Sequence, residues 1–166
     1  MTATPIQRAS RYFNRGTTKC YFLPTIQDED AGPTRQELDA GTDLSPEIAE
    51  IEGWTVSSEM IETPDLATVH TGSIPGSSTS EESSITFYAD VTGEDVRTLL
   101  PRGTEGYIVW LDGGDVAGSP MDVFPVRVAS QSKTRTLDDE AATIVVNFAI
   151  PREPIENLTV PAAAGG

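Results

Sequence analysis

Short runs of alternating apolar and polar residues, each ended by proline or glycine, constrain the fold of this 166-residue chain more than any other feature. Such alternation places one face of a strand against a core and leaves the other face polar. The pattern predicts strands at residues 19–23, 85–91, 107–111, 121–130 and 142–150. A further stretch, residues 47–61, alternates in two phases, and Gly53 between them predicts a bend. The chain is therefore expected to be mainly β.

Two segments have helical features. Residues 34–40 predict a short helical turn that Gly41 would end in a left-handed cap. Thr92 is expected to cap a helix over residues 92–100, with Glu94 and Asp95 in its first turn. The order of elements predicts a mainly β fold with one packed helix, a β-sandwich or partly closed barrel whose helix lies across one opening. Its open strand edges would favour association with further copies.

The stretch between residues 62 and 84 is rich in Gly, Ser and Thr and has too little apolar surface to order by itself. We expect a long inter-strand loop there, since a gap of about 20 residues in a compact domain is usually functional or disordered. The predicted organisation is a basic N-terminal arm (1–16), a β-sandwich domain (17–151) and an extended C-terminal tail (152–166).

The charge of the chain is unevenly distributed. Residues 1–27 contain four basic residues and no acid, a local charge of +4. The remaining residues hold 26 acids and 7 bases, which gives −19 and a net charge of −15. This balance argues against a protein that grips nucleic-acid phosphates. A basic arm on an acidic body would attract like copies head to tail, although a simply solvated arm is an equal alternative.

The chain lacks the residues that most catalytic and metal sites need. Cys20 and His70 are the sole cysteine and histidine, which excludes a Cys/His zinc, haem or thiol–imidazole site. Cys20 is expected to be a small buried hydrophobe and His70 an exposed loop residue. The acidic stretches 28–30 and 112–115 lack calcium-loop spacing and are expected to be turns. We therefore expect no catalytic residue, metal, cofactor or enzymatic activity. No apolar run is long enough to cross a membrane, and no membrane partner is expected.

Several segments in order resemble one known family. They are residues 34–44, 48–54, 83–88, 100–106, 110–115 and 121–126. Their succession resembles the tail tube (major tail) protein of long-tailed, siphovirus-like bacteriophages, especially those of actinobacterial hosts, from about residue 17 to residue 161.

The resemblance implies a structural virion protein made in the host bacterial cytoplasm. In that family a β-sandwich subunit with one helix forms homohexameric rings through its sheet edges. The rings stack into a hollow tube that conducts viral DNA without specific binding. Other tail proteins would be its partners: the tape measure, the terminators, and the baseplate or tip. The segment 62–84 corresponds in position to a long loop that touches a neighbouring ring.

The same resemblance suggests where assembly residues lie. Arg8, Arg11 and Arg15 would form inter-subunit charge pairs. Ile74 and Pro75 would form the apolar tip of the inter-ring loop, which also carries Glu81 and Glu82. An acidic wall would keep DNA sliding in the tube, because attraction to phosphate would impede it. Candidates for that wall are Glu50, Glu52, Glu59 and Asp122, although Arg127 lies in the same strand as Asp122.

Two other functions stay open at this stage. A receptor- or carbohydrate-binding β-sandwich module of a tail would also be acidic and β-rich, but its aromatic residues usually gather on loops. Trp54 and Trp110 instead lie within strand patterns. A small carbohydrate hydrolase would need two carboxylates across a cleft. Many carboxylates are available, yet no aromatic sugar platform surrounds any pair.

Overall fold

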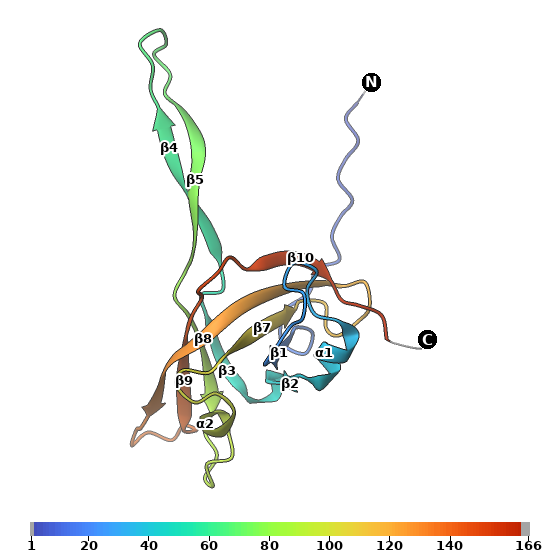
Figure 1. Ribbon diagram of the computed structural model, residues 1–166, viewed down its shortest axis with the longest axis vertical. Coiled ribbons are helices and arrows are strands. Elements are labelled where there is room, and N and C mark those ends of the chain that lie inside the picture. The colour runs from blue at the N-terminus through green and yellow to red at the C-terminus, as the bar shows by residue number, and fades with distance from the viewer. Residues whose placement is uncertain (1, 164–166) are drawn as a thin grey trace.

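The computed structural model describes residues 2–163 and shows a mainly β, sandwich-like fold built from antiparallel strands (Figure 1). The strands are β1 (Lys19–Leu23), β2 (Thr42–Asp43), β3 (Ile48–Glu52), β4 (Val56–Thr63), β5 (Gly72–Ser80), β6 (Ser83–Tyr88), β7 (Glu105–Leu111), β8 (Pro120–Thr134), β9 (Thr143–Ala149) and β10 (Ile155–Thr159). The helices are α1 (Arg35–Ala40) and α2 (Val96–Leu99), with a 3-10 turn η1 (Ser45–Glu47).

The longest strand, β8, connects the two layers of the sandwich. Seven strands of an eight-stranded sheet follow the order β2-β1-β7-β8-β9-β6-β3, and the eighth, β10, pairs with β8. The first half of β8 pairs with β7 and the second half with β9, and the register shifts between Val128 and Ser130. Because a bulge bends the strand that carries it, β8 can serve both layers.

The inner core fills the space between these layers. Alternate residues of β1, β7 and β8, such as Phe22, Trp110 and Phe124, face Phe87 and Phe148 from β6 and β9. Val96 and Leu100 at α2 close the cluster. The predicted alternation of these strands is confirmed, and Cys20 is buried in this core.

The opposite face of the β1-β7-β8 layer is buried as well. Tyr107, Val109 and Leu111 of β7 pack there against Leu38 of α1 and Val160 of the C-terminal segment. Burial on both faces explains why β7 is apolar at every position from 107 to 111. Thr34 caps α1 with a capping box completed by Glu37. The left-handed cap predicted at Gly41 is wrong, since its φ is −72°.

The sandwich does not close into a barrel within the described residues. Strands β2 and β3 lie at the two ends of the sheet path and are not paired with each other, although only η1 separates them in the chain. Each therefore leaves one backbone edge open. The predicted bend at Gly53 is confirmed: its φ is 81°, and it separates β3 from β4.

The predicted loop at 62–84 is wrong for most of its length. Residues 72–80 form β5, which pairs with β4 in a two-stranded hairpin that extends far from the body (Figure 1). Although Gly and Pro have low β propensity, β4 supplies partners to β5 on both sides of a register shift. The two strands join through the hairpin tip, residues 64–71.

Three other boundaries differ from those predicted. The helix predicted at 92–100 is shorter, and Asp95 rather than Thr92 caps it. Strand β8 continues to Thr134, beyond its predicted end at residue 130, because β9 pairs along it. The C-terminal tail contains β10, which pairs with β8, so it is not merely extended. Residues 164–166 of that tail and Met1 of the arm lie outside the described residues.

Candidate functional site

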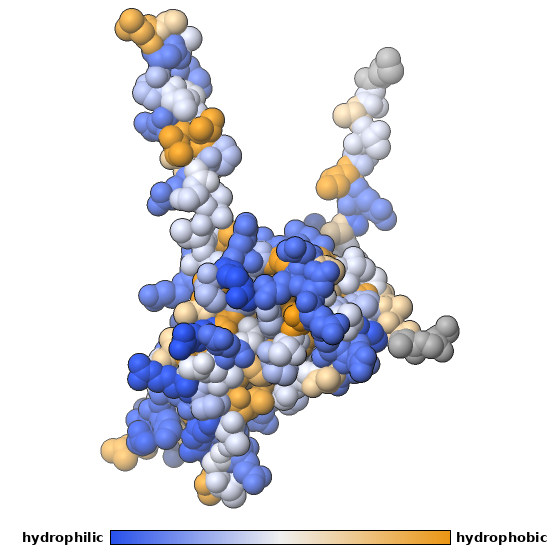
Figure 2. Space-filling view, viewed as in Figure 1, coloured by the Kyte–Doolittle hydropathy of each residue, from blue (hydrophilic) through white to orange (hydrophobic). Residues whose placement is uncertain are grey.

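Two appendages project from the sandwich body, the N-terminal arm (residues 2–16) and the β4–β5 hairpin (residues 56–80). In the view of Figure 2 both extend in the same general direction, well clear of the body. Every residue from 2 to 15 is exposed, and no hydrogen bond joins residues 2–13 to another part of the described chain. The arm contains Arg8, Arg11 and Arg15, together with the exposed apolar side chains Ile6 and Phe13.

The hairpin exposes apolar side chains at two levels. Ile61 and Ile74 are cross-strand partners half-way along it, and Met60 pairs with Pro75 beside them. The side chains of Met60, Ile61 and Ile74 are all exposed, and Figure 2 shows an apolar patch at that height. The prediction that Ile74 and Pro75 form the tip is wrong, because register places them in the stalk.

The hairpin tip carries Leu66 and Val69, which are fully exposed. Asp65 accepts hydrogen bonds from the backbone N–H groups of Ala67 and Thr68 at 2.8 and 2.9 Å, and from the Thr68 hydroxyl. These bonds lower the pKa of Asp65, the Thr68 hydroxyl bond most of all. His70 is exposed here, as predicted. The tip is an ordered turn that presents two apolar side chains.

Trp54 anchors the root of the hairpin in the body. Its indole lies against the rings of Trp110, Phe124 and Phe148, with centroid distances of 5.3–5.4 Å. Its indole N–H donates to the Ser84 carbonyl at 3.2 Å. Trp54 has a φ of 65°, a left-handed conformation that costs free energy in a non-glycine residue. Such packing holds the direction of the hairpin relative to the sandwich.

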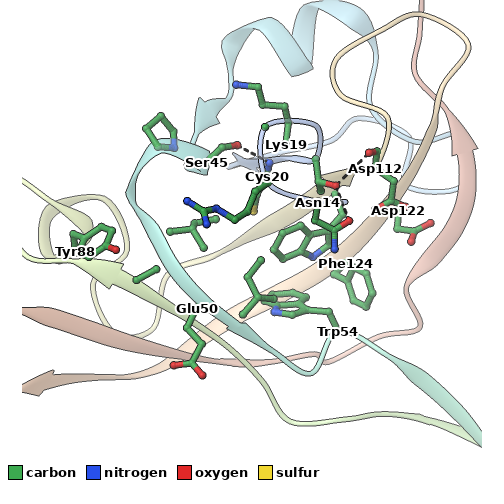
Figure 3. Close-up of a pocket in the computed structure, with 18 residues that line it drawn as sticks. Asn14, Lys19, Cys20, Ser45, Glu50, Trp54, Tyr88, Asp112, Asp122 and Phe124 are labelled. Atoms are coloured by element: carbon green, nitrogen blue, oxygen red, sulfur yellow. Dashed lines mark hydrogen bonds between the residues drawn. The ribbon is translucent and has the colours of Figure 1, made fainter. Parts of the chain in front are cut away.

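A groove of about 870 Å³ lies in the open seam of the sandwich (Figure 3). Its walls come from the root of the arm (Asn14–Gly16), from β1 and η1, and from residues 48–51 of β3. Trp54, Trp110 and Phe124 are among its aromatic lining. Among the described residues, the Trp110 indole nitrogen is the one buried side-chain polar atom without a hydrogen-bond partner.

Two carboxylates lie at one end of this groove. Figure 3 shows Asp112 and Asp122 beside Asn14, and Glu50 at the opposite end with its carboxylate directed away from them. Burial, and then the charge of Asp122, raise the pKa of Asp112. Asp122 accepts a hydrogen bond at 2.8 Å from the backbone N–H of Asn157, which ties β10 to β8. This end of the groove would favour a bound cation.

The predicted acidic residues do not form one cluster. Glu50 and Glu52 share one exposed strand, β3, whereas Glu59 lies on β4 in the separate hairpin sheet. Asp122 is half-buried in β8. Glu81 and Glu82 are exposed where β5 passes into β6, at the hairpin root rather than along a loop.

The outer face of the β1-β7 layer is held by ionic networks. Arg35 of α1 donates to Asp115 at 2.6 Å and also pairs with Asp39, and the Tyr21 hydroxyl donates to Asp115 at 2.9 Å. Burial, followed by the bond to Asp115, raises the pKa of Tyr21 to about 12. Both predicted turns are confirmed: residues 28–31 and 112–115 each close on a local hydrogen bond. These contacts tie α1 to the body.

Residues 2–163 contain no group of three or more His, Cys, Asp or Glu side chains placed to hold a metal ion. Across the same part of the chain, no helix combines the length and apolar character that a membrane crossing requires.

A comparison with known protein families identifies the family of this chain. A family model described as phage tail tube protein matches residues 6–163. The chain belongs to this phage tail tube protein family. The match includes most of the arm, the hairpin and β10, so these parts belong to the family domain rather than to additions. No protein of curated function matches the chain.

Solved structures similar to this tail tube protein come from phage-like assemblies. One is the cryo-EM structure of the anti-feeding prophage (AFP) baseplate, 6-fold symmetrised, with a TM-score of 0.55 and 8% identity over 93% of this chain and 96% of that chain. Another is SPP1 Dit (gp 19.1), a hub adsorption apparatus protein of Gram-positive infecting phages, with a TM-score of 0.37 and 16% identity. That match covers 79% of this chain and 48% of that one. The first likeness supports the fold. The family match over residues 6–163 makes the protein a structural tail component.

Several residues of the candidate site were missed by sequence reasoning. Leu66 and Val69 lie at the true tip, and a turn centred on Asp65 was the available signal. Trp54 and Trp110 border one groove although they are far apart in sequence, and no local signal predicts that juxtaposition.

Proposed function

We propose that this tail tube protein forms homohexameric rings that stack into a hollow tube through which viral DNA passes. The observation that carries the proposal is the match to the tail tube family over residues 6–163. The related fold in the AFP baseplate belongs to an assembly described as 6-fold symmetrised, which supports six copies per ring. The subunit works by assembly and needs no catalytic residue, metal or cofactor.

The open sheet edges support ring formation. Strands β2 and β3 end the sheet path and each has one unpaired backbone edge. Unpaired edges bind further strands, and closing a ring removes them. In a head-to-tail ring, the open β3 edge of one copy would bind an extended segment of the next copy. Every subunit then makes the same two contacts, and the closed ring has no terminal subunit.

The hairpin supports stacking between rings. A two-stranded hairpin with no third strand is marginally stable by itself in water. Here it exposes Ile61 and Ile74 in the stalk and Leu66 and Val69 at the tip. Burying these side chains against a neighbouring ring would stabilise both the hairpin and the stack. Glu81 and Glu82 at the hairpin root would lie at the edge of that contact.

We assign the tube wall to the acidic strands. Glu50 and Glu52 on β3 are exposed and are the main candidates, whereas Glu59 lies on β4 in the separate hairpin sheet. Six copies of such an edge would surround the bore with carboxylates, which repel phosphate and keep the duplex centred. Asp122 is the weakest of these candidates, because its carboxylate bonds to the Asn157 backbone.

Electron microscopy of the purified protein over a concentration and salt series tests the proposal. We expect six-fold rings or hollow tubes. The variant Leu66→Ser/Val69→Ser should yield rings but few or short tubes. Leu137→Ser is the control, because Leu137 is equally exposed but lies in the β8–β9 connection. A monomer at every concentration would refute the tube function.

A receptor- or glycan-binding role is the second candidate, and the groove favours it. Both tryptophans border that groove, together with Asp112 and Asp122. However, Trp54 packs its ring against three other aromatic rings, so it does not offer a free platform for a sugar. Glycan-array binding by a persistent monomer would support this role over the tube.

A further inference from the structure

The groove is bordered by an unpaired strand. Strand β3 pairs with β6 along one edge only, and residues 48–51 line the groove. The unpaired edge presents backbone N–H and C=O groups that an extended segment can bind as an added strand. The groove lining also contains Trp110, whose buried indole N–H has no acceptor among the described residues. This groove has the features of a peptide-binding site.

The N-terminal arm has the form of a segment that could bind in this groove. Residues 2–13 are extended, exposed and without hydrogen bonds to the described remainder of the chain. In an extended segment Arg8 and Tyr12 point to one face, and Arg11 and Phe13 point to the other. Each face therefore presents one guanidinium and one aromatic ring. The side chains of Tyr12 and Phe13 are 56% and 76% exposed, which leaves apolar surface to be covered.

One end of the groove is complementary in charge to the arm, although Arg15 and Lys19 also line the groove. The acids Asp112 and Asp122 lie at one end of the groove, and neither pairs with a basic side chain among residues 2–163. Their mutual repulsion contributes to the raised pKa of Asp112, so a guanidinium at this end would stabilise both carboxylates. Arg8, Arg11 and Arg15, the three arm guanidinium groups, form no ion pair among those residues, and Arg8 and Arg11 are the two that lie outside the groove wall.

The local backbone directs each arm away from its own groove. The Asn14 carbonyl accepts hydrogen bonds from the backbone N–H groups of Thr17 and Thr18, and Gly16 has a φ of 79°. This turn forms part of the groove wall, and the arm leaves from it away from the body (Figure 1). A return into the same groove would require undoing the turn. The occupant is therefore the arm of another copy.

We propose that residues 5–13 of a second copy lie in this groove as a strand on the open edge of β3, with an arm arginine against Asp112 and Asp122 and an arm aromatic ring beside Trp54. The inference rests on the proposed function, since it names the surface that receives the arm between subunits. It also explains why one chain carries a basic arm and an acidic body.

A charge-swap experiment tests the pairing. Variant A is Arg8→Glu/Arg11→Glu. Variant B is Asp112→Lys/Asp122→Asn, in which the new side-chain amide at position 122 keeps an oxygen for the Asn157 N–H. Light scattering measures the concentration at which each assembles. We expect A or B alone to need a concentration at least about tenfold higher than wild type. Mixing A with B should restore assembly, because the arm of each then meets a groove of opposite charge.

Matched controls change the same charges elsewhere. Lys133→Glu/Arg135→Glu repeats the change of A, and Asp138→Lys/Asp139→Asn repeats that of B, all at exposed positions outside the groove. These controls should assemble as wild type does and should not rescue A or B. Equal loss in the controls, or no rescue on mixing, would overturn the proposal.

Photo-crosslinking gives a readout that leaves the groove unaltered. Benzoylphenylalanine at Tyr12 should crosslink to residues 46–54 or 110–124 of another copy, which mixed isotopically light and heavy copies identify by mass spectrometry. Crosslinks to the hairpin, or within one chain, would overturn the arm–groove pairing. If the wild-type protein forms tubes and the groove variants assemble as it does, only this inference is rejected and the tube function stands. Crosslinked dimers without tubes would support it and reject the tube.

Discussion

The sandwich body and its two appendages differ in where their apolar side chains lie. In the body, Phe87, Phe124 and Ile144 are almost fully buried and contact side chains of the same chain. In the appendages, Ile6, Leu66 and Val69 are almost fully exposed. Apolar burial within one chain stabilises the body, whereas the appendages leave that stabilisation for contacts with other molecules. One sequence thus encodes a folding unit and two exposed appendages, which in the proposed tube would join the units.

The comparison predicts that unfolding and assembly respond to different residues. Changes in the body should lower the free energy of unfolding, and changes in the appendages should alter assembly alone. The four predictions below test that separation, from the largest expected effect on folding to the smallest.

The largest loss is expected for Phe124→Ala. Phe124 is 1% exposed and contacts Trp54, so its removal leaves a cavity in the inner core. The free energy of unfolding should fall by about 3–5 kcal/mol, measured by urea denaturation of the unassembled protein. Phe13→Ala in the arm is the control and should leave it unchanged. An equal loss in both would contradict the division between body and appendage.

Gly53→Ala tests the junction between the two regions. Gly53 has a φ of 81°, and a methyl group there would overlap the Glu82 carbonyl oxygen. The left-handed backbone alone costs about 1–3 kcal/mol, and the contact adds to it. Gly118→Ala is the matched control, because its φ is 87° and nothing lies within 4 Å. Denaturation should show the larger loss at Gly53, and a larger loss at Gly118 would contradict the close approach.

The third prediction concerns Asp95 and the pH dependence of the free energy of unfolding. Asp95 caps α2 and pairs with Arg97 at 2.7 Å, and the bonds from Arg97 hold the pKa of its carboxyl well below its usual range. A carboxyl group whose pKa is lower in the folded than in the unfolded state stabilises the fold at pH values above the unfolded-state pKa. This stabilisation is lost as the pH falls toward the folded-state pKa. Asp95→Ala should cost about 1–2 kcal/mol at pH 7.

The difference between Asp95→Ala and wild type should narrow below about pH 4. Chemical denaturation at a series of pH values measures this trend. Asp138→Ala serves as the control, since Asp138 is an exposed carboxylate outside the helix cap. A difference that stays constant down to about pH 3 would show that the carboxylate charge does not contribute.

The smallest effect on folding is expected for Ile74→Ser in the hairpin. Ile74 is 52% exposed and belongs to neither core cluster. The free energy of unfolding of the body should change by less than about 0.5 kcal/mol, while tube length in electron microscopy should fall. Ser73→Ala at the neighbouring position is the control. Unchanged tubes would show that the stalk patch has no partner.

Local patterns predicted much of the body. The alternation in residues 19–23, 85–91 and 142–150 identified strands because their buried faces follow the period of two. The bend at Gly53 was also predictable, since glycine adopts positive φ readily. By contrast, β5 is rich in Gly and Ser and β10 contains Asn157, and their strand form depends on β4 and β8 as partners.

The candidate site was predicted only in part. The basic arm was visible as a charge run, yet its predicted pairing with other subunits stays a prediction. Ile74 was expected at a loop tip, whereas the register with Ile61 places it in the stalk. Register depends on every pair along two strands, so no short window of sequence determines it.

Residue type and near neighbours alone are enough to predict the strands with clear alternation, the charge division between arm and body, and the lack of Cys/His chemistry. Tertiary structure decided that residues near 14, 50, 54, 110 and 122 border one groove, and that β3 keeps an open edge beside it. Those facts depend on which distant strands pair, and strand pairing is fixed by packing of the whole core rather than by any local segment.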